Sequence, residues 1–475
     1  MIDERVIVLI TLVTYQVLLI GIGWWASKRT HDSEDFFLGG RNLGGFVAAI
    51  SASASSSSAW TLLGVSGAAY AWGLSALWLF PATLSGFLIN WVLIAPRLRT
   101  LAGESGAVTL TDVMAATARG ERSLAVARLA SIIVLVSFGF YVAAQFQAAG
   151  AAFDSQFGLD AELSVLIGAL IVVLYTLLGG FWAVSVTDSV QGVLMAVTAV
   201  ILPLAGVLAV GGLGPLWEHL ASAGDGGPFG ARAAPAAIGF VAGTLGIGLG
   251  YPGQPHVLNR FMALGDDQAL RRARLIAVGW AVVVYAGMLC TGWCARMLLD
   301  PADAAGEQAF YGLTASLFPP VVAGMMLAAV LSAIMSTADS QLLVAASSVS
   351  HDLRRGIEQR ISLSKSRAVV LGLSAFALAL ALYAPQSIFS RVLFAWHAVG
   401  SAFGPLVVAM LLGRVIPVPV RLAAMGAGAG LTVLAHWLAD SPGDWLERLL
   451  PLGVSAVIVW AGSRPSRDQR GLASR

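Results

Sequence analysis

Apolar stretches long enough to cross a bilayer follow one another along almost the whole chain, and short polar segments separate them. A membrane-spanning helix needs about 20 mostly apolar residues, and such stretches recur from one end of the sequence to the other. The pattern predicts an all-α polytopic membrane protein with 13 transmembrane helices. These helices are expected near residues 6–26, 44–72, 75–95, 124–151, 161–178, 181–210, 234–253, 275–298, 320–349, 368–384, 387–412, 421–438 and 449–463.

Basic residues are distributed unevenly between these spans. If the N-terminus lies outside, the segments that then face the cytoplasm hold 23 of the 28 Lys and Arg residues. The positive-inside rule therefore predicts an outside N-terminus, a cytoplasmic C-terminus and an odd number of spans. No basic region precedes residues 6–26, so this segment is expected to be a retained helix and not a signal peptide.

Composition excludes a soluble protein and a large extramembrane domain. Hydrophobic residues make up 57% of the chain and charged residues 11%, against about 25% charged residues in an ordinary soluble domain. The longest segment expected on the outer side, 211–233, is expected to contain a short helix around Trp217. Residues 464–475 are expected to be a cytosolic tail. Cys290 and Cys294 lie at i and i+4 on one predicted helix and are expected to be buried thiols, not a disulfide or a metal site.

Two of the predicted spans are interrupted by helix-breaking residues. The second contains SASASSSSAW at residues 51–60, with six Ser in ten positions, and the seventh crowds four Gly and two Pro into residues 246–255. Breaks of this kind free backbone carbonyls, which is tolerated only where the backbone is buried or lines a cavity. Two interrupted spans, five spans apart, indicate an inverted-repeat secondary transporter with its site near the midplane.

The ninth predicted span carries a polar helix face within the segment AIMSTADSQLL. The residues at i, i+3, i+4 and i+7 of this face are Ala333, Ser336, Thr337 and Ser340, and Asp339 lies about one turn from Ser336. An Asp at the bilayer centre costs about 2.5 to 3.5 kcal/mol, so it is rarely there without a use. Such oxygens suit a small hard cation such as Na⁺. The alternative is that the hydroxyls bond to carbonyls of their own helix or join neighbouring helices.

Five motifs together resemble those of the solute:sodium symporter family, and within it most closely the sodium/proline symporters. They are DFFLGGRNLGG, WVLIAPRLR, GGFWAVSVTDSVQ, GYPGQPHVLNRFMA and MSTADSQLL. The resemblance implies a core of the leucine-transporter type, made of two inverted five-helix repeats. It implies an extra helix at 6–26, the repeats at 44–210 and 234–412, two extra helices within 421–463, and the tail from 464.

The resemblance also implies a sodium site between the first broken helix and the ninth span. Its expected ligands are the carbonyls of Ala54, Ser57 and Ala333 and the hydroxyls of Ser336 and Thr337. Five neutral oxygens suit a weakly held monovalent ion, whereas a group of carboxylates would suit Ca²⁺.

The resemblance also implies a second cation site, because some members of the family have one. Only two acidic residues fall well inside the predicted spans, Asp188 and Asp339. The corresponding set is Asp188, Ser336, Asp339 and Ser340. Alternatively, Asp188 bonds to Ser185 or to backbone amides, and Asp339 exchanges a proton, because burial raises the pKa of a carboxyl group.

The sequence departs from the sodium/proline symporters at two positions. Ser56 stands where those relatives carry an Asp, and Ile247 stands where they carry a Trp. The first departure removes an acid near the expected sodium site, and the second changes a position near the expected solute.

Six polar or aromatic side chains are candidates for binding the solute. They lie at the two breaks and on the fourth span: Ser58, Trp60, Tyr141, Gln145, Tyr251 and Gln254. A zwitterion would need amides or a freed helix N-terminus for its carboxylate, and carbonyls or hydroxyls for its ammonium group. No Arg or Lys is expected to face this cavity, which argues against substrates with several negative charges. His397 is interpreted as a packing residue.

These observations predict a symporter of the bacterial inner membrane that couples Na⁺ to a small zwitterionic solute, with L-proline as the first choice. The alternatives are another small solute (another amino acid, a monocarboxylate or sialic acid) or a transporter-like membrane sensor. An enzyme is not expected, since no nucleophile-base-acid set or closed metal site is evident. The expected partners are the solute, Na⁺ and membrane lipid, without nucleic acid or an obligate protein partner.

Overall fold

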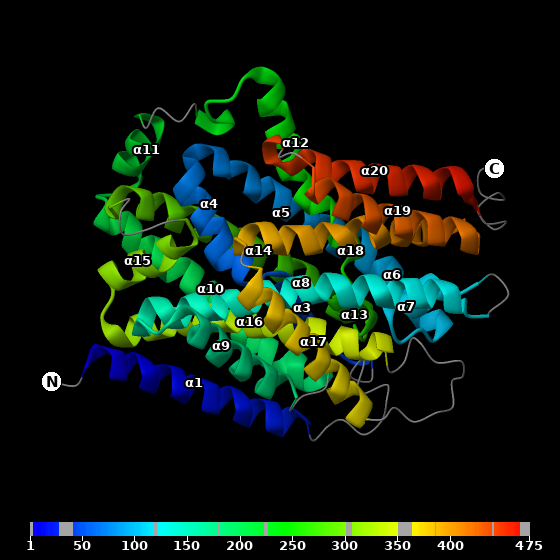
Figure 1. Cartoon of the computed structure of the whole chain (residues 1–475), viewed down its shortest axis with the longest axis horizontal. Helices are drawn as coiled ribbons and strands as arrows, with labels where there is room; N and C mark the ends of the chain where they lie inside the picture. The colour runs from blue at the N-terminus through cyan, green and yellow to red at the C-terminus, as the bar shows by residue number, and fades with distance from the viewer. Residues whose placement is uncertain are drawn as a thin grey trace.

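The computed structural model consists of long helices that lie roughly along one direction, with α1 (Glu4–Ser27) along one edge and α20 (Trp445–Gly462) along the opposite edge (Figure 1). It describes residues 3–27, 41–117, 121–177, 181–222, 227–300, 306–349, 363–384, 386–438 and 441–465. The first part of the DFFLGGRNLGG motif, residues 179–180 of the GGFWAVSVTDSVQ motif and the predicted tail from residue 466 lie outside the described residues.

The second predicted span is broken, as expected. Helix α3 (Gly45–Ser56) ends at Ser57, whose φ of −118° and ψ of 76° are not helical. The π-helical segment η2 (Trp60–Gly64) then leads into α4 (Val65–Trp72). Ten of the twelve residues of α3 are buried, so the Ser-rich sequence is packed inside the protein.

The seventh predicted span, 234–253, matches the apolar segment Ala234–Gly253 of the structure, and it is also broken. Helix α12 (Ala234–Leu249) leads through the short η6 (Tyr251–Gly253) into α13 (Pro255–Met262), and all eight residues of α13 are buried. Pro255 occupies the first turn of α13, where its missing N–H is not needed for a helical hydrogen bond. The proline therefore begins a second, buried half-helix beyond the predicted span.

The remaining described elements extend or connect the predicted spans. In chain order they are η3 (Gly73–Trp78), α5 (Leu79–Leu88), η4 (Ile89–Ile94), α6 (Ala95–Ser105), α7 (Leu110–Ala115), α8 (Leu124–Phe157), α9 (Ala161–Thr176), α10 (Phe181–Ala209), α11 (Leu213–Ser222), η5 (Gly227–Phe229), α14 (Asp267–Leu298), η7 (Gly306–Gln308), α15 (Ala309–Leu317), α16 (Pro320–Ser347), α17 (Leu363–Tyr383), α18 (Ile388–Leu411), β1 (Arg414–Val415), α19 (Val418–His436), η9 (Pro442–Asp444) and β2 (Arg464–Pro465). The helix expected around Trp217 is α11. On α14, Cys294 is buried as predicted, whereas Cys290 is only half-buried.

Eleven helices of the described chain are long and apolar enough to cross a membrane. Two of the predicted spans share parts of the 46-residue segment Trp60–Ser105, and another contains the shorter apolar helix α9, Ala161–Thr176. The polytopic all-α architecture is confirmed, and the number 13 stays a prediction.

Burial separates an inner set of helices from an outer set. Of an 18-residue apolar stretch in each helix, 83% is buried in α16 and 94% in α18, against 17% in α1 and 22% in α20. Helix α14 packs closely on its neighbours: a Cβ atom added at Gly287 would lie 1.9 Å from the carbonyl oxygen of Ala199 on α10. Small residues allow such approaches between membrane helices. Both helix breaks lie against this inner set, since α16 contacts α3 and α18 contacts η6.

Candidate ion and solute site

The broken end of α3 meets the polar face of α16. The Ser336 hydroxyl donates to the carbonyl oxygens of Ala54 and Ala333, both at 3.3 Å. The Thr337 hydroxyl donates to the carbonyl of Ser55 at 3.1 Å. The backbone amide of Ser57, at the break itself, donates to the carbonyl of Ala54 at 3.1 Å. The residues predicted as sodium ligands are therefore neighbours in the structure, and we call them the α3–α16 junction: Ala54, Ser57, Ala333, Ser336 and Thr337.

Every oxygen at the α3–α16 junction is neutral. Ser336 and Thr337 are both fully buried, and their hydroxyls join α16 to α3, as the alternative interpretation expected. A hydroxyl can rotate to turn its lone pairs toward an ion, and a carbonyl oxygen carries two lone pairs. Carbonyls and hydroxyls of this kind are hard ligands that suit Na⁺.

A buried ion pair lies beside the junction, and the sequence analysis missed one of its members. Arg260 on α13 is 2% exposed, and its Nη2 atom donates to Asp188 Oδ2 at 2.8 Å. The same carboxylate oxygen accepts from the hydroxyls of Ser51 at 2.7 Å and Ser55 at 3.1 Å. Arg260 was not expected here because it lies beyond the predicted end of the seventh span, whereas α13 continues past the break and is buried. The expectation that no Arg or Lys faces the solute cavity stays a prediction. Ser185 does not bond to Asp188; its hydroxyl donates to a carbonyl of its own helix.

Ser340 connects this ion pair to α16. Its hydroxyl accepts from Arg260 Nη2 at 2.6 Å, donates to the carbonyl of Ser336 at 2.7 Å and lies 3.0 Å from the Ser55 hydroxyl. It also lies 3.3 Å from Asp339 Oδ1. The four residues predicted as a second cation site are thus close together, but the cation that contacts Asp188 is an arginine side chain.

Four of the candidate solute residues lie at the first break: Ser58, Trp60, Tyr141 and Gln145. The Tyr141 hydroxyl donates to the Ser58 hydroxyl at 3.3 Å, and the backbone amide of Ala59 donates to Gln145 Oε1 at 3.1 Å. All of these residues are buried. The ring of Trp60 packs at 5.6 Å from Phe389, measured between ring centroids.

The other two candidates lie at the second break. Gln254 Nε2 donates to the carbonyls of Gly250 at 3.1 Å and Trp396 at 2.9 Å. The Tyr251 hydroxyl lies 3.3 Å from that of Tyr285 on α14. These bonds attach the second break to α14 and α18.

Tyr285 links the two breaks, and the sequence analysis did not single it out. Its hydroxyl lies 3.2 Å from that of Ser57 and 3.3 Å from that of Thr61, in addition to its contact with Tyr251. Trp396 was also missed, although its ring packs 4.7 Å from that of Tyr251. The available signal was a Tyr and a Trp within otherwise apolar helices, which is too common a pattern to select them.

Several buried polar atoms near the breaks have no hydrogen-bond partner among the described residues. They include the donors Trp60 Nε1 and Gln145 Nε2 and the acceptor Gln254 Oε1. Buried polar groups are almost always paired, so these atoms are available to bind a water molecule, an ion or a solute. Donors and an acceptor together could satisfy both ends of a zwitterion.

The two departures from the proline symporters have distinct surroundings. The hydroxyl of Ser56 donates to the carbonyl of Ser53 on its own helix at 3.0 Å. Ile247 is buried, and its carbonyl accepts from Trp396 Nε1 at 3.3 Å.

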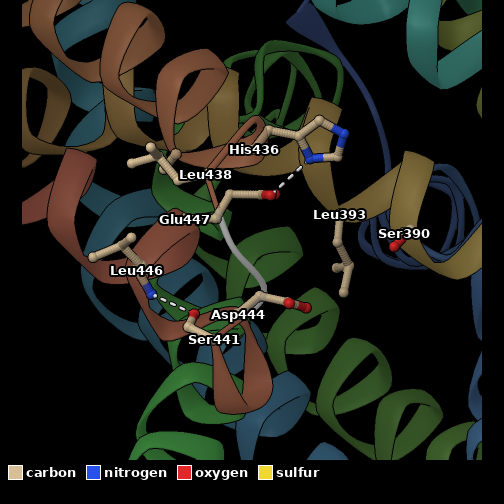
Figure 2. A pocket seen from close by; sticks show the side chains of 9 residues that line it. Ser390, Leu393, His436, Leu438, Ser441, Asp444, Leu446 and Glu447 are labelled. Carbon is tan, nitrogen blue, oxygen red and sulfur yellow. Dashed lines mark hydrogen bonds and ion pairs between the residues drawn. The ribbon is translucent and has the colours of Figure 1, made fainter.

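A separate polar pocket lies between α18, α19 and α20, and no residue of either break lines it (Figure 2). In it His436 Nδ1 and Glu447 Oε2 are 2.8 Å apart, and the amide of Leu446 donates to the Ser441 hydroxyl at 3.2 Å. The ring of His436 packs on Phe394 of α18, with 4.4 Å between the centroids. These contacts hold the outer helices α19 and α20 against the inner helix α18.

Comparisons with known proteins agree with this architecture. The chain is 36% identical over 455 residues to the osmoregulated proline transporter OpuE of Bacillus subtilis, covering 92% of this chain and 90% of that protein. It is 35% identical over 441 residues to the sodium/proline symporter of Escherichia coli, covering 89% and 86%. A solved structure of a Na⁺-coupled sialic acid symporter, in a substrate-bound outward-open state, shares the fold with a TM-score of 0.75 at 17% identity, covering 97% of this chain and 99% of that one.

The model of the sodium:solute symporter family matches residues 36–427, which include both breaks, the α3–α16 junction and the buried ion pair. This confirms the resemblance drawn from the five motifs, and it places the chain among transporters and not among enzymes. The protein belongs to the sodium:solute symporter family.

Proposed function

We propose that this protein is a sodium-coupled symporter that imports a small zwitterion, with L-proline as its solute, by alternating access. The observation that carries the proposal is the α3–α16 junction, where the carbonyl of Ala54 meets the hydroxyl of Ser336 beside a helix break. The names of the relatives, which are proline transporters, support the choice of solute.

Sodium would be held by the three carbonyls and two hydroxyls of the α3–α16 junction. An ion at this place bonds to α3 and α16 at once, so it stabilises the arrangement in which the two helices are in contact. Because the solute candidates Ser58 and Trp60 follow directly after the break, ion binding also fixes the solute site. A ligand shifts a conformational equilibrium by its difference in affinity for the two states, which is the basis of coupling here.

The unpartnered atoms at the breaks suggest how the zwitterion is held. Trp60 Nε1 and Gln145 Nε2 would donate to the carboxylate, and Gln254 Oε1 would accept from the ammonium group. The aromatic rings of Tyr141 and Tyr251 would enclose the apolar part of the solute. No full charge of the protein is needed to bind a neutral zwitterion in this way.

The driving force is sufficient for nutrient uptake. One Na⁺ moving down about 100 mV yields roughly 2.3 kcal/mol. A tenfold concentration gradient adds about 1.4 kcal/mol. With one ion per neutral solute, this supports roughly 500-fold accumulation.

The proposal includes the membrane arrangement predicted from sequence. The chain would lie in the bacterial inner membrane in contact with lipid, with 13 spans, its N-terminus outside and its C-terminus in the cytoplasm. The repeats would be residues 44–210 and 234–412. The first described helix, α1, begins at one end of the long axis and the last, α20, ends at the opposite end (Figure 1), as an odd number of crossings requires, which supports this arrangement.

The test is uptake of radiolabelled L-proline into proteoliposomes that contain the purified full-length protein, with Na⁺ and H⁺ gradients imposed separately. We expect uptake with the Na⁺ gradient alone, and competition by excess unlabelled L-proline. Uptake driven by H⁺ without Na⁺ would show that the coupling ion is wrong. Competition by another amino acid, a monocarboxylate or sialic acid, but not by proline, would show that the solute is wrong while leaving sodium coupling intact.

A further inference from the structure

The side chain of Arg260 fills the centre of a buried polar cluster that the proposed transport cycle does not use. All three of its nitrogen atoms donate hydrogen bonds. Nε donates to the Ser51 hydroxyl at 2.8 Å, and Nη1 donates to the carbonyl of His256. Nη2 donates to Asp188 Oδ2 at 2.8 Å and to the Ser340 hydroxyl at 2.6 Å. The guanidinium is therefore held from three helices and has little freedom to move.

This cluster lies one helical turn from the α3–α16 junction along two different helices. On α3, Ser51 precedes Ala54 by three residues, and on α16, Ser340 follows Ser336 by four residues. Since an α-helix rises 1.5 Å per residue, the guanidinium partners lie about 5 Å from the candidate sodium ligands along each helix axis. A positive charge at this distance affects any ion bound at the junction.

The oxygens around the guanidinium form a set that would suit a sodium ion if the arginine were absent. They are one carboxylate, that of Asp188, and the hydroxyls of Ser51, Ser55 and Ser340. The hydroxyls of Ser51 and Ser55 lie 2.7 and 3.1 Å from Asp188 Oδ2, and that of Ser340 lies 3.0 Å from that of Ser55. Hard monovalent and divalent cations prefer carboxylate and neutral oxygen ligands of this kind.

We propose that Arg260 is a tethered cation: its guanidinium permanently takes the place of a second monovalent cation at Asp188, so that the protein couples a single Na⁺ to each solute. This proposal rests on the proposed sodium symport. It replaces the second cation site predicted from the sequence at Asp188, Asp339 and Ser340, because the cation that site would attract is supplied by the chain itself.

Arginine is suited to this role for two reasons. Its guanidinium is always charged in proteins, and its fixed fork of donors can serve several oxygens at once, as it does here. A buried carboxylate left without its partner is strongly unfavourable. When the arginine is removed, Asp188 should therefore attract another cation. Replacing Arg260 by a neutral residue should therefore open the site to Na⁺.

The test is the number of sodium ions bound and transported per protein. Equilibrium binding of radioactive Na⁺ to the purified full-length protein gives the first number, and the membrane potential at which solute flux is zero in proteoliposomes gives the second. We expect one ion for the wild type by both measurements. Arg260→Gln should bind two, with a Hill coefficient for Na⁺ rising from about 1 toward 2.

Three further variants separate charge from packing. Arg260→Lys keeps the positive charge and should bind one ion. The double variant Arg260→Gln with Asp188→Asn removes both charges and should also bind one. Arg448→Gln is the matched control, because Arg448 is likewise a buried arginine paired with an aspartate, Asp444 at 2.6 Å, but lies on α20. It should leave the ion count at one.

Two ions bound or transported by the wild type would overturn the proposal, whatever the variants do. A folded Arg260→Gln protein that still binds one ion would overturn it as well. If Arg260→Gln does not fold, the wild-type and Arg260→Lys counts decide, since both must be one. A wild type that binds no Na⁺ and transports proline without it would instead refute the sodium symport on which the proposal rests.

Discussion

The two helix breaks differ in the charge of the groups beside them, although both interrupt a membrane span and free polar backbone groups. The first break follows a Ser-rich half-helix, α3, and every polar group there is neutral. The second break precedes a half-helix, α13, that carries Arg260 inward. The two half-helices pack against each other, so the neutral oxygens and the fixed charge are neighbours. A weakly held ion that must bind and leave is best served by neutral ligands, whereas a permanent charge suits a position that should stay occupied.

The largest expected effect comes from removing the partner of the fixed charge. Asp188→Asn leaves Arg260 as an unpaired buried cation about one turn from the α3–α16 junction. At an effective dielectric constant of about 20 and a distance of about 5 Å, repulsion of a bound Na⁺ amounts to roughly 3 kcal/mol. We expect the Na⁺ concentration for half-maximal proline uptake to rise about 100-fold.

Adding Arg260→Gln to this variant should restore most of the sodium affinity, because the two charges are then removed together. A sodium titration of uptake in the single and double variants measures both effects. Unchanged sodium dependence in Asp188→Asn would mean that the ion pair does not influence the junction, and the contrast between the two breaks would lose its electrostatic basis.

The next largest effect is expected from the neutral ligands of the first break. Ser336→Ala and Thr337→Ala each remove one of five oxygens from a site without spare ligands. Each should raise the half-maximal Na⁺ concentration tenfold or more, equivalent to about 1.4 kcal/mol. The control on the same helix is Ser347→Ala, whose hydroxyl donates only within its own helix, to the carbonyl of Val344 at 2.7 Å. Wild-type sodium dependence in both test variants would exclude the assignment of the site.

Much of this arrangement could be predicted from the sequence, because the length and composition of apolar segments identify membrane helices. The breaks were also visible, since six Ser in ten residues at 51–60 and the Gly-Pro cluster at 246–255 conflict with regular helices. The hydroxyl spacing on α16 placed Ser336 and Thr337 on one face, and the structure brings that face to α3.

The role of Arg260 could not be predicted in the same way, and the reason is physical. Positive charges at the end of an apolar run usually mark the cytoplasmic boundary, so the residue was counted with the loop that follows. Only the third dimension shows that α13 is buried and that Asp188, 72 residues earlier in the chain, neutralises the charge. Tyr285 was missed for a similar reason, because its importance lies in contacts with three other segments.

A smaller effect, on the solute and not on the ion, is expected at the second break. Gln254→Ala removes an unpartnered acceptor and two hydrogen bonds, to Gly250 and Trp396. Losing one hydrogen bond to a charged group costs about 1.5 to 3 kcal/mol. The half-maximal proline concentration should therefore rise at least tenfold, while that of Na⁺ changes less than threefold. Gln16→Ala, on the outer helix α1, is the control. An equal shift for both substrates would show that the two breaks form one site without division of roles.

The smallest effect concerns stability at the start of α18, the helix whose Trp396 holds the second break. Glu307 in η7 accepts from the amides of Ile388 at 3.2 Å and Phe389 at 2.7 Å. Burial raises the pKa of this carboxyl group above its usual value, although the two amide bonds lower it in part. A raised pKa in the folded state means that proton uptake favours folding, so this group adds stability as the pH falls toward that pKa. Glu307→Gln has no such proton to take up.

The melting temperature of the wild type relative to Glu307→Gln should therefore increase, by a few degrees at most, as the pH is lowered from 8 to 5. The exposed Glu104→Gln on α6 controls for the loss of one negative charge. If the relative melting temperature instead decreases on acidification, the ionised carboxylate is the form that the fold favours, and its two bonds to the α18 amides outweigh burial. In that case a charge at the start of α18 supports the second break, in addition to Arg260 on α13, and the contrast with the uncharged first break becomes sharper.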